Sequence, residues 1–364
     1  MLPTSLIITT YNEAGSIEPL LDSILGQTKP FTEIVFCDAS TDNTPHILQS
    51  FADAHPDLHV QIILAPETNI SQGRNIAIAA ARCDVIAVAD AGTVLKADWR
   101  EQITAPFNMP TVGAVGGWFE PHTTNIFEVA LAATTLPRAS EIDPEQFAPS
   151  SRSVAFRKDA WAAVGGFPEW QPWGEDVVFD HLMLSHLLAK HRDETGQLPD
   201  RDRVFPTQFE AIVYFRPRKN IKAFYRQYWR YAYGGGIGGI GTERAVTRYT
   251  AYAIGVCLMA GALVMLPWSL VAWVPLLAGA WFYVRTPYRR LAEGWPDLSF
   301  REKSIAMVWV PVIRLAGDIA KMCGFIAGQL WRRKNDHRPE IHWRDTLEVD
   351  VDLSPGASGL KLRF

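Results

Sequence analysis

Two stretches specify the fold, Leu6-Ile7-Ile8-Thr9-Thr10-Tyr11-Asn12-Glu13 and Ile34-Val35-Phe36-Cys37-Asp38-Ala39-Ser40-Thr41-Asp42. Each begins as a short apolar, β-branched run and stops abruptly at polar residues, which is typical of a buried strand that enters a loop. Between them, Ile17 to Gln27 has apolar residues at helical spacing. Strand, helix and strand in this order predict a parallel βαβ unit.

The same alternation continues along the chain. After the second stretch we expect helices at Thr44–His55 and Ser71–Arg82, and strands at Val60–Leu64 and Val85–Ala89. This pattern predicts an α/β fold with a doubly wound, mostly parallel, Rossmann-like sheet in residues 1–220. In such sheets the ligand crevice lies beyond the carboxyl ends of the strands. Tyr11, Asp38 and Asp90 each follow a strand, so we expect all three to face one crevice.

The C-terminal part has a different composition, because Ala251 to Val284 contains no charged residue. This run is too long for one membrane span of about 20 residues and barely long enough for two. We therefore predict a transmembrane helical hairpin at 249–284 with its turn at Pro267-Trp268-Ser269. Arginines follow directly from Arg285, and the positive-inside rule places them on the cytoplasmic side.

The segments that flank the hairpin are amphipathic or polar. Residues 221–248 predict an amphipathic juxtamembrane helix, followed by a glycine run from Gly234 that we interpret as a flexible hinge. Residues 285–331 predict a basic loop and then an interfacial helix, with a third membrane span as the alternative, because Arg314, Asp318 and Lys321 fall on one arc. Residues 332–364 predict a cytoplasmic tail.

The overall composition excludes one class of partner and indicates a compartment. The 364 residues carry a net charge of -4, which argues against nucleic acid as a partner. The four cysteines have no metal-type spacing, and Cys37 and Cys83 read as buried free thiols. The N-terminus lacks the pattern of a signal peptide. We therefore expect the N-terminal domain in the cytoplasm, at the inner (cytoplasmic) membrane.

Two aspartates at strand ends suggest a nucleotide site. Asp38 can accept a hydrogen bond from the N3–H of uracil, and Tyr11 offers a ring for the base or sugar, although Asp38 to Asp42 is also ordinary turn chemistry. Asp90 can bind a divalent cation, Mg²⁺ or Mn²⁺, that bridges two phosphates. Gly92 stands where a second metal-binding acid is expected, which weakens the metal interpretation.

Later acidic and basic residues suggest the remaining chemistry. Asp176, or its neighbour Glu175, can take the proton of an attacking hydroxyl, although both also suit a helix N-terminus. Arg230 can pair with a diphosphate, or anchor at the membrane surface. Arg74 can reach nucleotide oxygens, or lie solvated at a helix end.

In these motifs and their order, the chain resembles the family-2 glycosyltransferases of the GT-A fold, especially bacterial membrane-associated members. The matching stretches run from Ser5 to Tyr231 and cover most of residues 1–240. The resemblance implies donor contacts at Thr10, Tyr11, Glu13, Asp38, Arg74, Asp90, Gln227 and Arg230. It further implies a metal motif at Asp90 and a general base at Asp176.

The function implied by the resemblance is inverting transfer of a sugar from a nucleotide donor, a UDP-sugar, to a hydroxyl acceptor. The hairpin favours a lipid-linked acceptor, and a saccharide acceptor is the alternative. Other possibilities are a polyprenyl-phosphate glycosyltransferase, a processive polysaccharide synthase and a membrane scaffold on a degenerate transferase fold.

Overall fold

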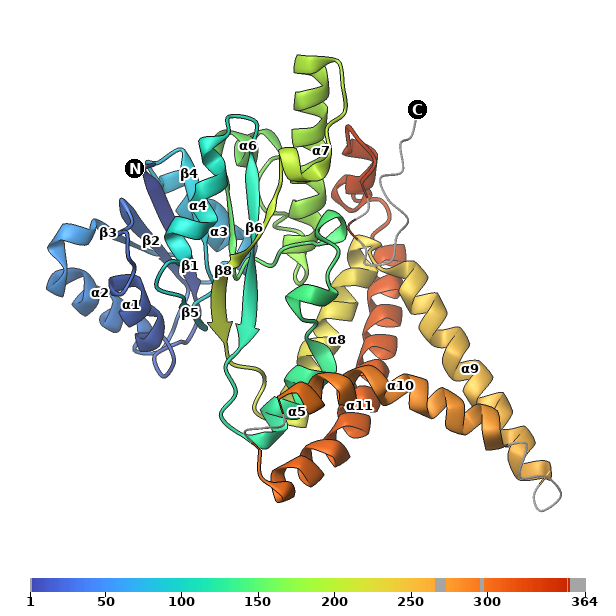
Figure 1. Ribbon diagram of the computed structural model, residues 1–364. Coiled ribbons are helices and arrows are strands. Elements are labelled where there is room, and N and C mark those ends of the chain that lie inside the picture. The colour runs from blue at the N-terminus through green and yellow to red at the C-terminus, as the bar shows by residue number, and fades with distance from the viewer. Residues whose placement is uncertain (1, 266–272, 295–297, 352, 354–364) are drawn as a thin grey trace. The chain divides into compact units, whose positions relative to one another are not determined.

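A computed structural model describes residues 2–265, 273–294, 298–351 and 353 (Figure 1). The chain divides into two compact units. The first comprises Met1–Pro121, Ala139–Arg216 and His342–Phe364, and the second comprises His122–Arg138 and Pro217–Ile341. The first unit thus lacks residues 122–138 and 217–220 of the expected 1–220 domain and includes part of the expected tail.

The first unit is built on one mixed sheet in the order β3-β2-β1-β4-β7-β6-β8-β5. Its strands are β1 (Thr4–Thr10), β2 (Glu33–Asp38), β3 (Val60–Leu64), β4 (Val85–Val88), β5 (Thr93–Leu95), β6 (Ala114–Pro121), β7 (Val154–Arg157) and β8 (Thr207–Phe215). Strands β1 to β4 pair in parallel, as the alternating pattern predicts, whereas β7 runs antiparallel to both β4 and β6. The Rossmann-like half is therefore followed by a mixed half.

Helices cover both faces of this sheet. They are α1 (Glu18–Leu25), α2 (Thr44–Ala54), α3 (Ile70–Ala80), α4 (Trp99–Thr104), α6 (Lys158–Ala163) and α7 (Glu175–Thr195). Successive strand residues point to opposite faces. In β1, Leu6 and Ile8 accordingly join one core with α1, α2 and α4, while Ile7 joins a second core with α3 and α7. Since both faces are buried, the strands read as continuous apolar runs.

The described end of the chain packs on α7. Val349, Val351 and Leu353 are buried in the second of these cores. The backbone N–H of Val349 donates to Ser185 Oγ at 2.8 Å, and that of Leu353 donates to His181 Nε2 at 3.3 Å. This part of the predicted tail therefore belongs to the core of the first unit.

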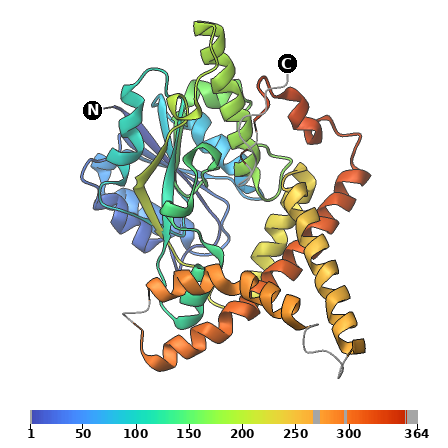
Figure 2. The same cartoon turned by 45° about the vertical axis from the view of Figure 1, so that its right-hand side comes forward.

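The second unit is helical. It contains α5 (Ile126–Thr135), α8 (Ile221–Gly238), α9 (Thr242–Met265), α10 (Val274–Glu293) and α11 (Phe300–Lys334). In both Figure 1 and Figure 2, the end of α9 and the start of α10 project away from α11. Over Thr242–Val264, α9 is long and apolar enough to cross a membrane, with a mean hydropathy of 1.3. The predicted turn at 267–269 lies outside the described residues.

The glycine run from Gly234 is not a hinge. It continues α8 as a helix to Gly238, so the expectation of a flexible segment was wrong. A Cβ on Gly236 would lie 2.6 Å from the Phe325 carbonyl oxygen, and one on Gly328 would lie 2.2 Å from the Tyr233 carbonyl oxygen. The glycines therefore allow the backbones of α8 and α11 to approach closely.

Helix α11 has a polar arc on one side and a row of exposed apolar side chains on another. Its polar arc faces α9 and α10, because Asp318 hydrogen-bonds Arg248 and Tyr283. On another face, large apolar side chains are exposed at Val308, Val312, Leu315, Ile319, Ile326 and Leu330. Their spacing of three, four and seven residues places them on one stripe.

Candidate nucleotide-sugar site

The carboxyl ends of β1 and β2 bring Thr10 beside Asp38, since the two residues are register partners. The Thr10 hydroxyl and the Ser40 hydroxyl, the latter at 2.7 Å, both donate to Asp38 Oδ1. The other oxygen, Oδ2, is buried and has no hydrogen-bond partner among the described residues. A buried acceptor without a partner is costly, and a ligand N–H would satisfy it.

The loops after these strands are held together by Asn12, which adopts a left-handed φ of 57°. Its Oδ1 accepts from the backbone N–H of Thr41 at 2.9 Å and of Asp42 at 3.2 Å. The neighbouring Tyr11 side chain is 66% exposed, so its ring is open to a ligand. Glu13 instead accepts from the Ser16 hydroxyl at the turn that leads into α1.

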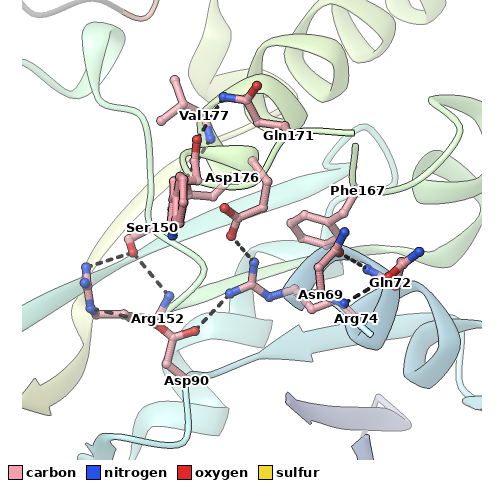
Figure 3. Close-up of polar contacts among 12 residues, drawn as sticks. Asn69, Gln72, Arg74, Asp90, Ser150, Arg152, Phe167, Gln171, Asp176 and Val177 are labelled. Carbon is pink, nitrogen blue, oxygen red and sulfur yellow. Dashed lines mark hydrogen bonds and ion pairs between the residues drawn. The ribbon is translucent and has the colours of Figure 1, made fainter. Parts of the chain in front are cut away.

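Arg74 joins the segment after β4 to the start of α7, which are far apart in sequence. It extends from the first turns of α3, which begins with a capping box between Asn69 and Gln72. Figure 3 shows its guanidinium between Asp90 and the start of α7. Arg74 Nη2 lies 3.0 Å from Asp90 Oδ1, and Nη1 lies 2.5 Å from Glu175 Oε1. The predicted solvated alternative for Arg74 is wrong, because its side chain is 2% exposed.

Electrostatics in this cluster follow from burial. Burial raises the pKa of Glu175, and the nearby Asp176 adds to this, while Arg74 opposes it. For Arg74, burial lowers the pKa, but the carboxylates of Glu175, Asp90 and Asp176 outweigh that effect and raise it. Arg74 is therefore a fixed cation between the end of β4 and the start of α7.

Helix α7 begins with Glu175 and Asp176, and the backbone conformation of the preceding residue, Gly174, favours glycine. Gly174 adopts a φ of 75°, a conformation that L side chains rarely adopt. Glu175 is buried against Arg74, whereas Asp176 is only partly buried, and its Oδ1 accepts from the Val177 backbone N–H at 3.0 Å. Of the two predicted acids, Asp176 is thus the more accessible.

Arg152 is a site residue that the sequence reasoning did not assign. Its Nε lies 3.9 Å from Asp90 Oδ2, and its guanidinium stacks over the rings of Phe119 and Phe215, 5.5 and 4.9 Å from their centroids. Arg152 begins one of the stretches that carry the family resemblance, Arg152 to Phe156, but nothing in the sequence around it specifies a contact with Asp90. Asp90 consequently has an arginine on each side.

The residues around Asp90 fit a protein-built metal centre poorly. No group of three or more potential ligands (His, Cys, Asp or Glu) occurs among the residues that the structure describes. Gly92 supplies no side chain, and Asp90 already pairs with Arg74. A Mg²⁺ ion often takes only one or two carboxylates beside phosphate oxygens and water. A cation at Asp90 would therefore depend on the donor for most of its ligands.

Gln227 and Arg230 lie on α8 in the second unit. Gln227 Nε2 donates to the Tyr231 hydroxyl at 2.7 Å, which orders this turn of the helix, and Arg230 is exposed. Because α8 belongs to the second unit, the approach of Arg230 to Asp38 and Asp90 remains a prediction.

Comparison with known proteins supports the family expectation. The model of "Glycosyl transferase family 2" matches residues 5–158. An uncharacterised glycosyltransferase of Nostoc sp. is 29% identical over 190 residues, which are 48% of this chain and 57% of that protein. The poly-beta-1,6-N-acetyl-D-glucosamine synthase of Staphylococcus epidermidis is 25% identical over 250 residues, covering 64% of this chain and 54% of the synthase.

Among solved structures, the mannosyltransferase PcManGT of Pyrobaculum calidifontis is 18% identical with a TM-score of 0.49, covering 92% of this chain and 88% of that one. The chain spans little more than half the length of the curated relatives it matches. The stretch from residue 5 to 158, which contains Asp38, Arg74 and Asp90, is a family-2 glycosyltransferase domain.

Proposed function

We propose that this protein is an inverting glycosyltransferase that moves a sugar from a UDP-sugar to an acceptor hydroxyl at the cytoplasmic membrane. The observation that carries the proposal is the Arg74 bridge, which ties Asp90, after β4, to the N-terminus of α7. Through this bridge the start of α7, with Asp176, lies at the same sheet edge as the buried Asp38 oxygen for which the described residues offer no partner.

In this proposal each residue has a distinct part. Asp38 accepts from the N3–H of uracil, and the Tyr11 ring lies against the base or sugar. Asp176 takes the proton of the acceptor hydroxyl as its oxygen attacks the anomeric carbon. The bond from that carbon to the diphosphate breaks, and the electron pair leaves with the diphosphate. Glu175 is a positioning residue, because it is buried and engaged by Arg74.

The leaving diphosphate gains negative charge, which cations near Asp90 would stabilise. Arg152 lies beside Asp90, and Arg230 is the predicted second contributor from α8. Fixed charges of this kind are often the largest contribution to catalysis. A divalent cation at Asp90 would supply further charge neutralisation, with the donor phosphates as its other ligands.

The membrane part of the proposal rests on exposed apolar surface. The candidate span of α9 is 23 residues long and only 6% of its apolar window is buried. At 1.5 Å per residue it measures about 34 Å, close to the thickness of a bilayer core. On α10, Leu277, Trp281 and Phe282 are also more than half exposed. In this proposal the apolar surface holds the protein at the bilayer that carries a lipid-linked acceptor.

The test measures the rate of sugar transfer by the full-length protein in detergent. A screen of nucleotide sugars, with and without Mg²⁺ or Mn²⁺ and with lipid extract, identifies the donor. Asp176→Asn should then lower the rate by roughly 10²- to 10⁴-fold, the usual contribution of a general base, and leave UDP binding nearly unchanged. The exposed Asp57 on the same unit provides a matched control, Asp57→Asn. Normal transfer by Asp176→Asn would refute the assignment of the base.

A further inference from the structure

A polar cluster connects the three long helices of the second unit. Asp318 on α11 is its centre: Oδ1 accepts from Arg248 Nε on α9 at 3.0 Å, and Oδ2 accepts from the Tyr283 hydroxyl on α10 at 2.8 Å. The Tyr252 hydroxyl lies 2.8 Å from that of Tyr283 and 3.3 Å from Asp318 Oδ2. These contacts hold α9 and α10 on α11.

The cluster holds more positive than negative charge. Lys321 Nζ lies 3.9 Å from Asp318 Oδ1, and the Arg314 guanidinium lies over the Tyr283 ring, 4.9 Å from its centroid. Arg314 Nε is buried without a hydrogen-bond partner in the described part of the chain. Arg248, Arg314 and Lys321 thus converge around the single carboxylate of Asp318. Cations held together in this way favour a bound anion.

The position of the cluster in the helices indicates the source of the anion. Arg248 lies just before the uncharged run of α9 and α10, and Tyr283 lies at its end. If this run occupies the hydrocarbon core, the cluster lies at the level of the lipid headgroups. The exposed apolar stripe of α11 lies on another face of the same helix and would contact acyl chains.

We propose that Arg248, Arg314 and Lys321 form a binding site for the phosphate group of a membrane lipid. The ligand class is a lipid phosphate monoester or diphosphate, whose oxygens match the forked donors of arginine. Asp318 and the two tyrosines are positioning residues, which keep the cations in place while the site is empty. The inference rests on the membrane part of the proposed function and names the group by which a lipid-linked acceptor is held.

The experiment measures binding of the full-length protein, in phosphatidylcholine nanodiscs, to phosphatidic acid added to the discs. Arg314→Gln and Lys321→Gln should each weaken binding about 10- to 100-fold, the usual effect of losing a charge-assisted hydrogen bond. Arg314→Lys keeps the charge and should recover part of the affinity. Arg333→Gln, an exposed arginine on the same helix, is the matched control and should have little effect.

Three results would overturn the proposal. One is an equal loss of affinity in Arg333→Gln, which would indicate general attraction to an anionic surface. Another is displacement of the lipid by inorganic phosphate, which would identify a free phosphate as the ligand. The last is wild-type affinity in both cluster variants. UDP-sugar hydrolysis measured in the same samples reports separately on the catalytic unit, so either proposal can fail alone.

Discussion

Removal of the Arg74 cation tests the central bridge of the candidate site. In Arg74→Met the apolar volume is largely kept, but the carboxylates of Glu175 and Asp90 lose their shared partner. The side chain of Glu175 is 9% exposed, whereas that of Asp90 is 32% exposed and can be hydrated. The loss of folding stability in Arg74→Met should therefore arise mainly from the unpaired charge of Glu175.

The size of the effect follows from this burial. Breaking a buried ion pair by removing one partner costs about 3–5 kcal/mol, because the remaining charge is left uncompensated. For a unit of this size, 1 kcal/mol shifts the Tm by about 2–4 °C, so we expect a loss of about 6–20 °C. In Arg74→Met/Glu175→Gln no buried charge remains at Glu175, and most of the loss should be recovered.

The pH dependence has a definite sign. Burial already raises the pKa of Glu175, and loss of Arg74, which opposes that shift, would raise it further. A carboxyl whose pKa is raised in the folded state keeps its contribution to stability at low pH and loses it as the pH rises through that pKa. The penalty of Arg74→Met should therefore shrink toward acidic pH and grow toward alkaline pH.

The assay is thermal unfolding of the full-length protein in detergent, followed by tryptophan fluorescence at several pH values. Arg82→Met is the matched control: Arg82 also pairs with a buried glutamate, Glu33, at 2.9 Å, but its own side chain is 69% exposed. Exposed partners of this kind contribute only about 0–1 kcal/mol. An unchanged Tm in Arg74→Met, or no recovery in the double variant, would show that Arg74 does not compensate the buried charge of Glu175.

Two further predictions concern positions outside the bridge. Burial, and secondarily the charge of Asp176, raises the pKa of Asp180 well above its ordinary value. Wild-type stability should therefore fall as the pH rises from the ordinary carboxyl pKa through the raised pKa of the folded state. Asp180→Asn should lack this decline and gain Tm relative to wild type with increasing pH; parallel pH profiles would contradict it. Gly328→Ala would place a Cβ 2.2 Å from the Tyr233 carbonyl oxygen and should cost about 1–3 kcal/mol or more by thermal unfolding. Gly255→Ala on α9, with open space around it, is its control and should be nearly neutral.

Some features of the site were predictable because they depend on local pattern. The apolar runs that end at Thr10 and Asp38 specify buried parallel strands, and the carboxyl ends of such strands share one edge. The buried thiol of Cys37 follows from the same run, and burial raises its pKa to about 11. The local pattern alone therefore places Thr10 and Asp38 at one edge of the sheet.

The partners of Arg74 could not be predicted in this way. A lone arginine on an alanine-rich helix has the same local sequence whether it is solvated or buried. Only the packing of α3 beside α7 and the end of β4 brings its guanidinium to Asp90 and Glu175. The same holds for Arg152, whose two aromatic neighbours come from β6 and β8.

Local sequence patterns account for the parallel half of the sheet, the family-2 motifs in its loops and the presence of a long apolar helix. Those features depend on the order and spacing of neighbouring residues, which the chain carries directly. The tertiary structure decided which acid of the Glu175-Asp176 pair is buried, why the glycines of α8 pack rather than bend, and where the charges of α11 point. Each of these depends on a contact between segments distant in sequence, and burial, which sets the energy of a charge, exists only after those segments have met.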